Sequence, residues 1–340
     1  MDVGKLPNEL LARLLGRIQR RDSRVLVGPG VGHDAAVIDA GGDRLLVAKS
    51  DPVTFASDNI GWYAVHVNAN DVACMGARPQ WFLATVLLPE GSPEEQASRV
   101  FGQVLEACEA LEIELVGGHT EITYGLDRPI VVGAMLGEVE REALVQPSGA
   151  REGDALILTK GIAIEGTAVL AGEASERLEH LGVASAALER ARRYVFEPGI
   201  SVVRDAQTCC EAVRAGAGAV HAMHDPTEGG LATALHEMAE ASGLGVEVRE
   251  EAITVLPETE AICAAASLSP LGLLASGALL VALAEDDCER ALAALGDAGI
   301  EARRIGSMVK QEVGVIMGKH AGTKAVPRFA RDEVARFLAG

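Results

Sequence analysis

Gly28-Pro-Gly-Val-Gly-His-Asp-Ala-Ala36 is the first of four short segments in which glycines stand beside a carboxylate. The other three are Asn70-Asp-Val-Ala-Cys-Met-Gly-Ala77, Gly117-Gly-His-Thr-Glu121 and His224-Asp-Pro-Thr-Glu-Gly-Gly230. We expect each segment to lie at the end of a strand or a helix. Glycine lets a backbone approach a ligand closely, and a carboxylate at such a place can hold a hard cation. One such segment would indicate only a turn, so the order of all four is the informative feature.

Together these segments resemble the PurM superfamily of ATP-dependent enzymes, and the resemblance extends from about Val25 to Met317. Two stretches are similar to the HypE-like, AIR synthase-related branch of that superfamily: the glycine loop Leu158-Thr-Lys-Gly-Ile-Ala-Ile-Glu-Gly-Thr-Ala-Val-Leu-Ala171 and the signature His224-Asp-Pro-Thr-Glu-Gly-Gly-Leu231. The resemblance implies an α/β (α+β) fold of two PurM-like domains. The first would be a mixed sheet with helices on one face that dimerises, and the second an α/β domain.

The composition agrees with two domains and argues against two kinds of partner. The chain has 340 residues, of which 49% are hydrophobic, and a net charge of −19. This length suits two domains of roughly 150–170 residues. Nucleic acids and anionic membranes bind clustered Lys and Arg, which such a charge disfavours, and no apolar run reaches the roughly 18 residues of a membrane span. We expect no nucleic-acid or membrane partner and a cytoplasmic location.

The domain boundary is predicted near Gln146-Pro-Ser-Gly-Ala150. We therefore expect an N-terminal ATP/Mg-binding and dimerisation domain over 1–147, a C-terminal domain over 148–325 and a tail over 326–340. In the first domain the hydrophobic pattern predicts helices over 8–20 and 60–75, a third beginning at Ser92-Pro-Glu-Glu95, and strands over 25–28, 35–39, 44–50, 81–88, 114–117 and 130–140. In the second it predicts strands over 154–159, 245–249, 276–283, 301–309 and 313–317, several helices within 166–242, and helices near 258–266 and 285–298.

Three aspartates are predicted to form a magnesium site. Asp34 follows a glycine run, Asp51 follows a strand, and Asp71 lies with Asn70 inside an otherwise apolar helix. Mg²⁺ is bound by a few carboxylates together with water and substrate phosphates. Asp34 or Asp51 alone would more simply be a solvated turn residue, but a buried Asp71 needs a polar partner. The superfamily resemblance implies a metal role for all three.

His33 is a departure from the superfamily pattern. Relatives commonly have Gly-Asp-Asp-Ala-Ala where this chain has Gly32-His-Asp-Ala-Ala36, so a histidine replaces one of two adjacent carboxylates. The number of metal ions is therefore left open. We expect the His33 ring to bond a phosphate or a loop carbonyl.

The remaining candidate ligands are implied by the resemblance. Glu121 would complete the metal site, although a polar turn after a strand is the simpler alternative. The nucleotide contacts from the four segments would be Gly30, Gly32, Asn70, Gly117, Gly118, Thr120, Glu228 and Gly229. Gly166 and Thr167 are added because they open a helix directly after a strand loop, and Lys49 is added as a basic residue. Lys49 and Lys160 are the nearest basic residues that could neutralise phosphate charge. Gly161 to Gly166 is not a Walker A motif, which needs Gly-x4-Gly-Lys-Ser/Thr.

The fourth segment has both a structural and a functional interpretation. Asp225 can cap a helix, with Pro226 at its first position and Glu228 completing a capping box. Gly229-Gly230 in a first turn would each cost about 1 kcal/mol relative to alanine. That cost is explained if something packs closely there, such as an anion at the exposed N–H groups. We interpret Asp225 as both cap and active-site residue and His224 as a candidate acid–base group.

The resemblance implies an enzyme that uses ATP and Mg²⁺ to activate an oxygen of a small-molecule acceptor as a phosphate, linked to hydrogenase maturation and its partner proteins. HypE proteins carry their substrate on a C-terminal cysteine, whereas the last cysteine here is Cys288, so we expect no covalent carbamoylation of the tail. A thiamine-monophosphate kinase-like phosphotransferase and a nucleotide-binding sensor without turnover remain alternatives. Strands apolar on both faces, together with the resemblance, predict a homodimer joined through the N-terminal sheet.

Overall fold

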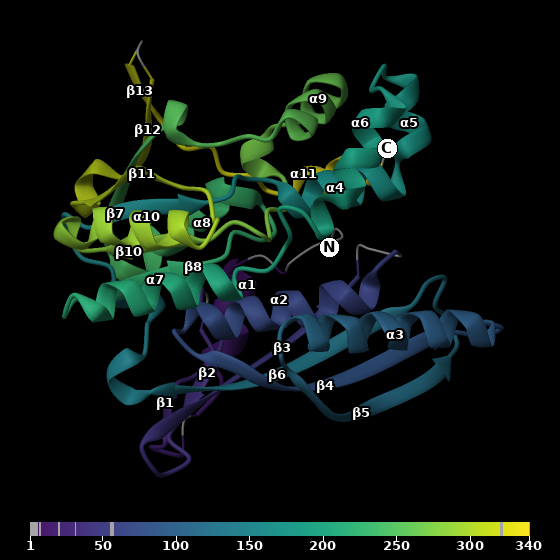
Figure 1. Ribbon diagram of the computed structural model, residues 1–340, viewed down its shortest axis with the longest axis horizontal. Coiled ribbons are helices and arrows are strands. Elements are labelled where there is room, and N and C mark those ends of the chain that lie inside the picture. The colour runs from purple at the N-terminus through teal and green to yellow at the C-terminus, as the bar shows by residue number, and fades with distance from the viewer. Residues whose placement is uncertain are drawn as a thin grey trace. The chain divides into compact units, whose positions relative to one another are not determined.

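The computed structural model describes residues 6, 8–19, 21–30, 32–54, 58–319 and 322–339. The chain divides into two compact units (Figure 1). The N-terminal unit comprises Gln19–Pro29 and His33–Leu144, and the C-terminal unit comprises Met1–Ile18, Gly30–Gly32 and Val145–Gly340. The predicted limits of 1–147, 148–325 and 326–340 stay a prediction, because these units follow spatial contacts and group the first 18 residues with the C-terminal half.

The N-terminal unit is a six-stranded mixed sheet in the order β1-β2-β3-β6-β4-β5. Its elements are β1 (Val25–Val27), β2 (Ala36–Ile38), β3 (Arg44–Val53), α2 (Ile60–Cys74), β4 (Arg78–Pro89), α3 (Glu94–Ala110), β5 (Glu114–Thr123), β6 (Ile130–Glu140) and η1 (Arg141–Ala143). All neighbouring strands are antiparallel except β4 and β5, which are parallel. Figure 1 shows α2 and α3 on one face of this sheet.

Helix α2 is buried along almost its whole length because it lies against both the sheet and α3. Its sequence has no polar stripe, which is the pattern of a helix covered on all sides. Gly61 makes the close approach of α3 possible, since a Cβ there would lie 2.6 Å from the carbonyl oxygen of Val100. Two amide side chains and a carboxylate on α2, those of Asn68, Asn70 and Asp71, are buried with it.

The strands of this sheet show why one face is packed and the other is not. Buried and half-buried residues alternate along β6 and most of β4, so the buried set faces α2 and α3. The edge strand β5 is exposed over nearly its whole length. Val116 and Ile122 are 50% and 61% exposed there. The sheet therefore presents apolar side chains that nothing in this unit covers.

The C-terminal unit is a seven-stranded mixed sheet in the order β13-β12-β9-β11-β7-β10-β8. Its strands are β7 (Ala155–Thr159), β8 (Val220–His224), β9 (Gly245–Arg249), β10 (Leu280–Leu283), β11 (Ala302–Val309), β12 (Val315–Lys319) and β13 (Gly322–Ala325). Strands β7 and β10 are buried at every residue, and with α8 they form the main core.

Nine helices and six shorter 3-10 turns complete the described part of this unit. The helices are α1 (Asn8–Leu15), α4 (Ile164–Glu173), α5 (Ser175–His180), α6 (Ser185–Arg192), α7 (Val203–Ala215), α8 (Gly230–Ser242), α9 (Pro257–Ala266) and α10 (Cys288–Asp297), followed near the C-terminus by α11 (Glu333–Leu338). The 3-10 turns are η2 (Pro147–Gly149), η3 (Arg193–Val195), η4 (Glu250–Ala252), η5 (Pro270–Gly272), η6 (Glu285–Asp287) and η7 (Gln311–Val313).

The predicted α/β fold of two PurM-like domains is confirmed, with three local corrections. Strand β8 (Val220–His224) lies within 166–242, where only helices were predicted. Strand β10 begins at Leu280 rather than at 276, and α11 forms within the predicted tail. Alternation is weak in such fully buried strands, so a short apolar run can resemble part of a helix. Across the described residues, no helix combines the length and apolar character needed to cross a membrane.

Candidate nucleotide and metal site

Three of the predicted metal ligands gather around one lysine in the N-terminal unit. Lys49 comes from β3 and Asp71 from α2, and the Nζ of Lys49 lies 2.8 Å from an Oδ2 of Asp71. The same ammonium lies 3.4 Å from Oδ2 of Asp51, two residues further along β3. Asp34 is near enough to act electrostatically on both Lys49 and Asp71. The fold thus brings Asp34, Asp51 and Asp71 together, as the sequence predicted.

The electrostatics of this cluster are those of an acidic site with one internal cation. Burial disfavours the ammonium of Lys49, but the charges of Asp71 and Asp51 outweigh it and raise its pKa above the usual value. Burial raises the pKa of Asp71, and repulsion from Asp34 and Asp51 adds to that rise, while Lys49 opposes it. The charged form of Asp71, which burial and its neighbouring carboxylates disfavour, would be stabilised by any cation that enters.

Asn68 is a part of this site that the sequence analysis did not name. Its Nδ2 donates to the carbonyl of Ala64 at 2.8 Å and to the carbonyl of Asp51 at 3.2 Å, so it ties α2 to β3 beside the acidic cluster. Gly133 of β6 leaves room for it, since a Cβ there would lie 2.3 Å from that Nδ2. The sequence signal was available: Asn68, like Asn70 and Asp71, is a polar residue in an otherwise apolar helix.

His33, which replaces a carboxylate of the superfamily pattern in the first segment, contacts the backbone of its own loop. The Nδ1 of His33 lies 2.8 Å from the carbonyl oxygen of Gly28, which confirms the expected bond to a loop carbonyl. Gly32 has a φ of +76°, a conformation that favours glycine. Gly30 and Gly32 are grouped with the C-terminal unit, so the first segment contributes to both units.

The third segment lies inside a strand and not at its end. Strand β5 was expected to stop at Gly117, but it continues to Thr123. Gly118, at a φ of +147°, allows this because a Cβ there would lie 1.9 Å from the carbonyl oxygen of Ala84 on β4. The glycine therefore serves strand pairing.

The register also sets the distance between the third segment and the aspartates. Across the sheet Asp51 aligns with Gly133, Gly133 with Ala84, and Ala84 with Gly118. Three strand spacings amount to about 14 Å. Glu121 and Thr120 lie beyond Gly118 on exposed β5, and an Oε2 of Glu121 lies 3.3 Å from Nε2 of His119. Within one N-terminal unit, Glu121 is therefore not brought to the aspartate cluster.

The fourth segment begins its helix later than the capping box predicted. Helix α8 starts at Gly230 with Gly229 as its N-cap, so Asp225 is not the cap. The N–H of Gly229 donates instead to Oδ2 of Asp332 at 2.7 Å, a residue 103 positions later. Backbone packs against Gly230, since a Cβ there would lie 2.5 Å from the carbonyl oxygen of Leu271, and the side chain of Thr233 packs against Gly229. Asp225 is fully buried and Glu228 half-buried in the loop before the helix.

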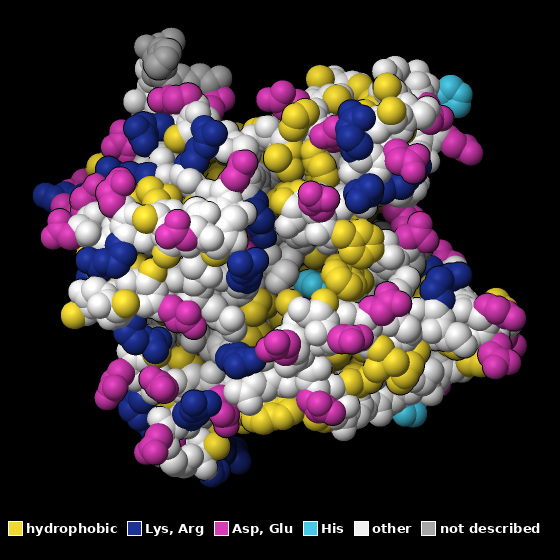
Figure 2. Space-filling view, viewed as in Figure 1, with side chains coloured by type: hydrophobic (Ala, Val, Ile, Leu, Met, Phe, Trp, Pro, Cys, Tyr) yellow, Lys and Arg dark blue, Asp and Glu magenta, His cyan; other side chains and the backbone are white. Residues whose placement is uncertain are grey.

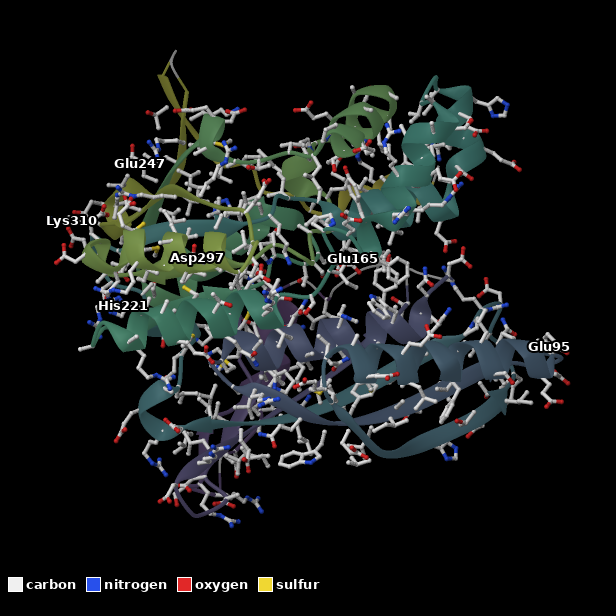
Figure 3. The ribbon with its side chains drawn as sticks, in the orientation of Figure 1. Glu95, Glu165, His221, Glu247, Asp297 and Lys310 are labelled. Atoms are coloured by element: carbon white, nitrogen blue, oxygen red, sulfur yellow. The ribbon has the colours of Figure 1, made fainter. Side chains whose placement is uncertain are left out.

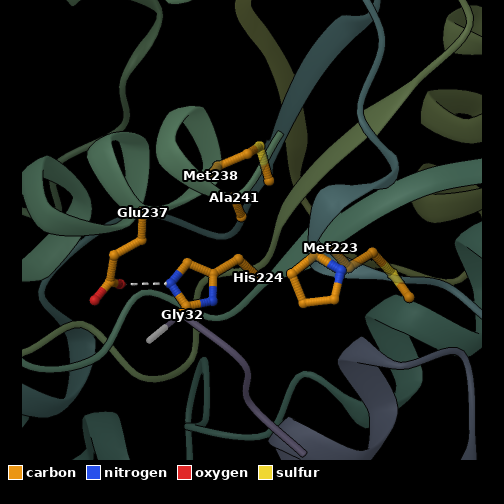
Figure 4. A pocket seen from close by; sticks show the side chains of 7 residues that line it. Gly32, Met223, His224, Glu237, Met238 and Ala241 are labelled. Atoms are coloured by element: carbon orange, nitrogen blue, oxygen red, sulfur yellow. Dashed lines mark hydrogen bonds and ion pairs between the residues drawn. The ribbon is translucent and has the colours of Figure 1, made fainter. Parts of the chain in front are cut away.

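His224, the predicted acid–base group, ends β8 and contacts an acidic side chain. Its Nε2 lies 2.9 Å from Oε2 of Glu237 on α8, and both line a small cavity with Met223 and Met238 (Figure 4). A carboxylate bonded to one ring nitrogen orients a histidine and stabilises its charged form. Glu237 was not named from the sequence, because its distance from His224 is set by how α8 packs on β8.

The glycine loop before α4 is engaged in packing. Gly166 donates its N–H to the carbonyl of Leu274 at 2.8 Å. The hydroxyl of Thr167 lies 2.7 Å from that of Thr259 on α9. Glu165, in the first turn of α4, is buried beside them (Figure 3). Lys160 is bound to Asp205, with 3.3 Å between Nζ and Oδ1.

Comparisons with known proteins agree with this architecture. The family described as AIR synthase related protein matches with its N-terminal domain over residues 32–139 and with its C-terminal domain over residues 151–319. A hydrogenase expression/formation protein of Methanocaldococcus jannaschii is 30% identical, over 91% of this chain and 90% of its own length. The carbamoyl dehydratase HypE of Cupriavidus necator is 32% identical, over 82% of this chain and 77% of its own.

Solved structures show the same fold. The hydrogenase maturation protein HypE in complex with ATP superposes with a TM-score of 0.71 at 26% identity, covering 96% of this chain and 91% of its own. A ThiL protein complexed with AMPPCP and TMP has a TM-score of 0.70 at 20% identity, covering 94% of each chain, and shows the likeness of fold alone. The chain therefore belongs to the AIR synthase related protein family, and its relatives there include the HypE carbamoyl dehydratases.

Proposed function

We propose that the protein binds Mg–ATP and transfers phosphate from it to an oxygen of a small-molecule acceptor, either as the product or as a step toward dehydration. The observation that carries this proposal is the cluster of Asp34, Asp51 and Asp71 around Lys49 in the N-terminal unit. Family membership supports it, and so does the relative that was solved in complex with ATP.

The residues of the cluster fit a magnesium ion. All three candidate ligands offer carboxylate oxygens, the donors that Mg²⁺ prefers. Burial raises the pKa of Asp71, and a nearby divalent cation would oppose that rise. Asp34, Asp51 and Asp71 would hold the ion, which would supply positive charge against the negative charge that develops during phosphoryl transfer. The overall charge of −19 makes such a bridge necessary, since a bare triphosphate would be repelled.

Lys49 then has a role that differs from a simple phosphate contact. Before a metal enters, its ammonium balances Asp71 and Asp51. In this way the acidic residues can be held together in the folded chain without their cation. With a cation held by the carboxylates, the ammonium of Lys49 would be available to neutralise a phosphate group.

We assign the acid–base role to His224, with Glu237 as the residue that positions it. The acceptor oxygen must lose a proton as it takes the phosphoryl group, and a histidine bonded to a carboxylate can accept and return one. The 2.9 Å contact between Nε2 and the Glu237 carboxylate supports this assignment. Asp225, next to His224 and fully buried, would help to fix this end of β8.

We also propose that the protein is a homodimer joined through its N-terminal sheet. The exposed apolar side chains of β5, including Val116 and Ile122, form a surface that pairing of two copies would bury. Light scattering at micromolar concentration should give twice the chain mass. A stable monomer that still binds ATP would contradict the dimer and leave the nucleotide proposal standing.

Calorimetry with Mg–ATP tests the proposed nucleotide site. Asp71→Asn should weaken Mg–ATP binding by at least about 10-fold, the usual scale for loss of metal-site support. Asp297→Asn is the matched control, because Asp297 is an exposed aspartate at the end of α10 (Figure 3). Equal ATP affinity in EDTA, or no effect of Asp71→Asn, would refute the metal assignment.

Turnover is tested separately by ADP release over a panel of small hydroxyl-, carboxyl- and amide-bearing metabolites. Sustained release with one acceptor would establish the enzyme, and His224→Gln should then lower kcat and remove a limb of its pH profile. Tight Mg–ATP binding without release for any acceptor would instead favour the nucleotide-sensor alternative.

A further inference from the structure

A large cavity in the C-terminal unit is not explained by the nucleotide segments. It measures about 850 Å³ and is formed by the loop after β7, by α6 and η3, by the first turns of α7 and α9, and by residues 298–301 after α10. This volume is within the range of small-molecule sites. None of residues 224–230 lines it, so it is separate from the His224 end of β8.

The wall of the cavity contains one buried ion pair, Lys160 with Asp205, and one partly exposed ion pair, Arg190 with Glu258. Lys160 is 9% exposed at its side chain, and its Nζ contacts Asp205 at 3.3 Å and the carbonyl of Ser201. Arg190 and the hydroxyl of Tyr194 both bind the carboxylate of Glu258. Lys160 also has a φ of +57°, a conformation that costs energy in a residue other than glycine. These charges are already balanced, and they give the cavity a rigid polar wall.

Four further charged residues line the cavity, and they are exposed to solvent rather than balanced in this way. They are Arg193, Glu197, Arg204 and Glu301. Among the described residues, none of these four makes a side-chain hydrogen bond or an ion pair. Two guanidinium groups and two carboxylates are therefore available to a ligand. This is a high share of cations for a chain with 30 basic and 49 acidic residues, in which acidic side chains are spread over the visible face (Figure 2).

We propose that this cavity binds a zwitterionic small molecule that carries both a carboxylate and an ammonium group, namely an amino acid or a short peptide. A simple anion would be attracted by Arg193 and Arg204 but repelled by Glu197 and Glu301, and a simple cation would meet the reverse. A ligand with both charges satisfies both pairs. Apolar side chains that also line the cavity would cover its carbon atoms.

The two kinds of charge have different tasks in this site. Arginine presents a planar set of donors that matches a carboxylate, and α7 begins among these residues, so its positive end adds to the attraction. The carboxylates of Glu197 and Glu301 accept hydrogen bonds from an ammonium group. The acceptor proposed for the phosphoryl transfer is not assigned to this cavity, so the two proposals stand or fall separately.

Isothermal calorimetry on the full-length protein tests the inference with the twenty common L-amino acids, glycylglycine and trialanine as probes. At least one probe should bind with a dissociation constant below about 1 mM, near −4 kcal/mol. Its N-acetylated and its C-amidated forms should each bind at least about 10-fold more weakly, the scale of one lost charged hydrogen bond. Failure of every probe to bind at 10 mM would overturn the proposal.

Substitutions of cavity residues test whether a probe that binds the protein does so in this cavity. Arg204→Ala and Glu301→Gln should each weaken the best probe by at least about 10-fold. Arg99→Ala is the matched control, because Arg99 is exposed on α3 of the N-terminal unit and should leave binding unchanged. Circular dichroism melting curves check that each variant is folded. Binding that is insensitive to both cavity variants, or equal for the acetylated probe, would show that the cavity is not a zwitterion site.

Discussion

Replacing Lys49 by methionine tests the idea that one ammonium holds the acidic cluster together. The side chain is only 20% exposed and lies 2.8 Å from Asp71 and 3.4 Å from Asp51. Removal of one partner from a buried pair costs about 3–5 kcal/mol. Asp51 is 41% exposed at its side chain and is screened by water, so we take the lower end, about 3 kcal/mol.

The free energy of unfolding that Lys49→Met removes should depend on pH. Burial and the neighbouring carboxylates already raise the pKa of Asp71, and loss of Lys49 would raise it further. A protonated Asp71 needs no cation, so the loss should be small at pH 5 and should grow as the pH rises and Asp71 ionises. The full cost is therefore expected near pH 8.

Magnesium should restore to the Lys49→Met protein the stability that the lysine ammonium supplied. A cation that binds only the folded state at 100 times its dissociation constant adds about 2.7 kcal/mol. Both tryptophans, Trp62 and Trp81, lie in the N-terminal unit, so tryptophan fluorescence during urea unfolding reports on this unit alone. Lys310→Met, at an exposed position, is the control. A Lys49→Met protein as stable as wild type at pH 8, or one that gains no more from Mg²⁺ than wild type does, would refute the reasoning.

Two further substitutions examine contacts that the structure makes specific. Gly118→Ala should destabilise the N-terminal unit by at least about 2 kcal/mol, because the new Cβ would meet the carbonyl of Ala84 and the backbone φ is +147°. The urea midpoint measured by tryptophan fluorescence should therefore fall. Gly117→Ala is the control and should hardly change that midpoint, because a Cβ on Gly117 has room. Asp332→Asn tests whether the free energy of unfolding depends on the ionisation of this carboxyl group. Burial raises the pKa of Asp332 from 3.8 to about 6. The wild-type carboxyl group therefore stabilises the fold most below pH 4, and this contribution is lost as the pH rises through 6. Relative to the variant, the wild-type free energy of unfolding should fall by about 3 kcal/mol over this range by calorimetry, and parallel curves for the two proteins would contradict the prediction.

Local chemistry was enough to predict much of this protein from its sequence. The hydrophobic pattern predicted the strand over 130–140 with both of its limits, and the apolar run from Ile60 predicted α2 to within one residue. The three aspartates could be grouped because their segments match a known family order, and the fold then brought them to one lysine. The bond from His33 to a loop carbonyl followed from the chemistry of a ring that replaces a carboxylate.

Contacts between distant parts of the chain decided the rest. The capping box at Asp225 was a sound local pattern, but the contact of Gly229 with Asp332 and of Gly230 with Leu271 moved the start of α8. Strand β5 continued through a double glycine because β4 pairs closely with it.

The pairing of His224 with Glu237, and the cavity that leaves Arg204 and Glu301 unpaired, have no local signature at all. A sequence pattern records the preferences of a short stretch of backbone. Which side chains meet across a core depends on how whole elements pack, and only the tertiary structure contains that information.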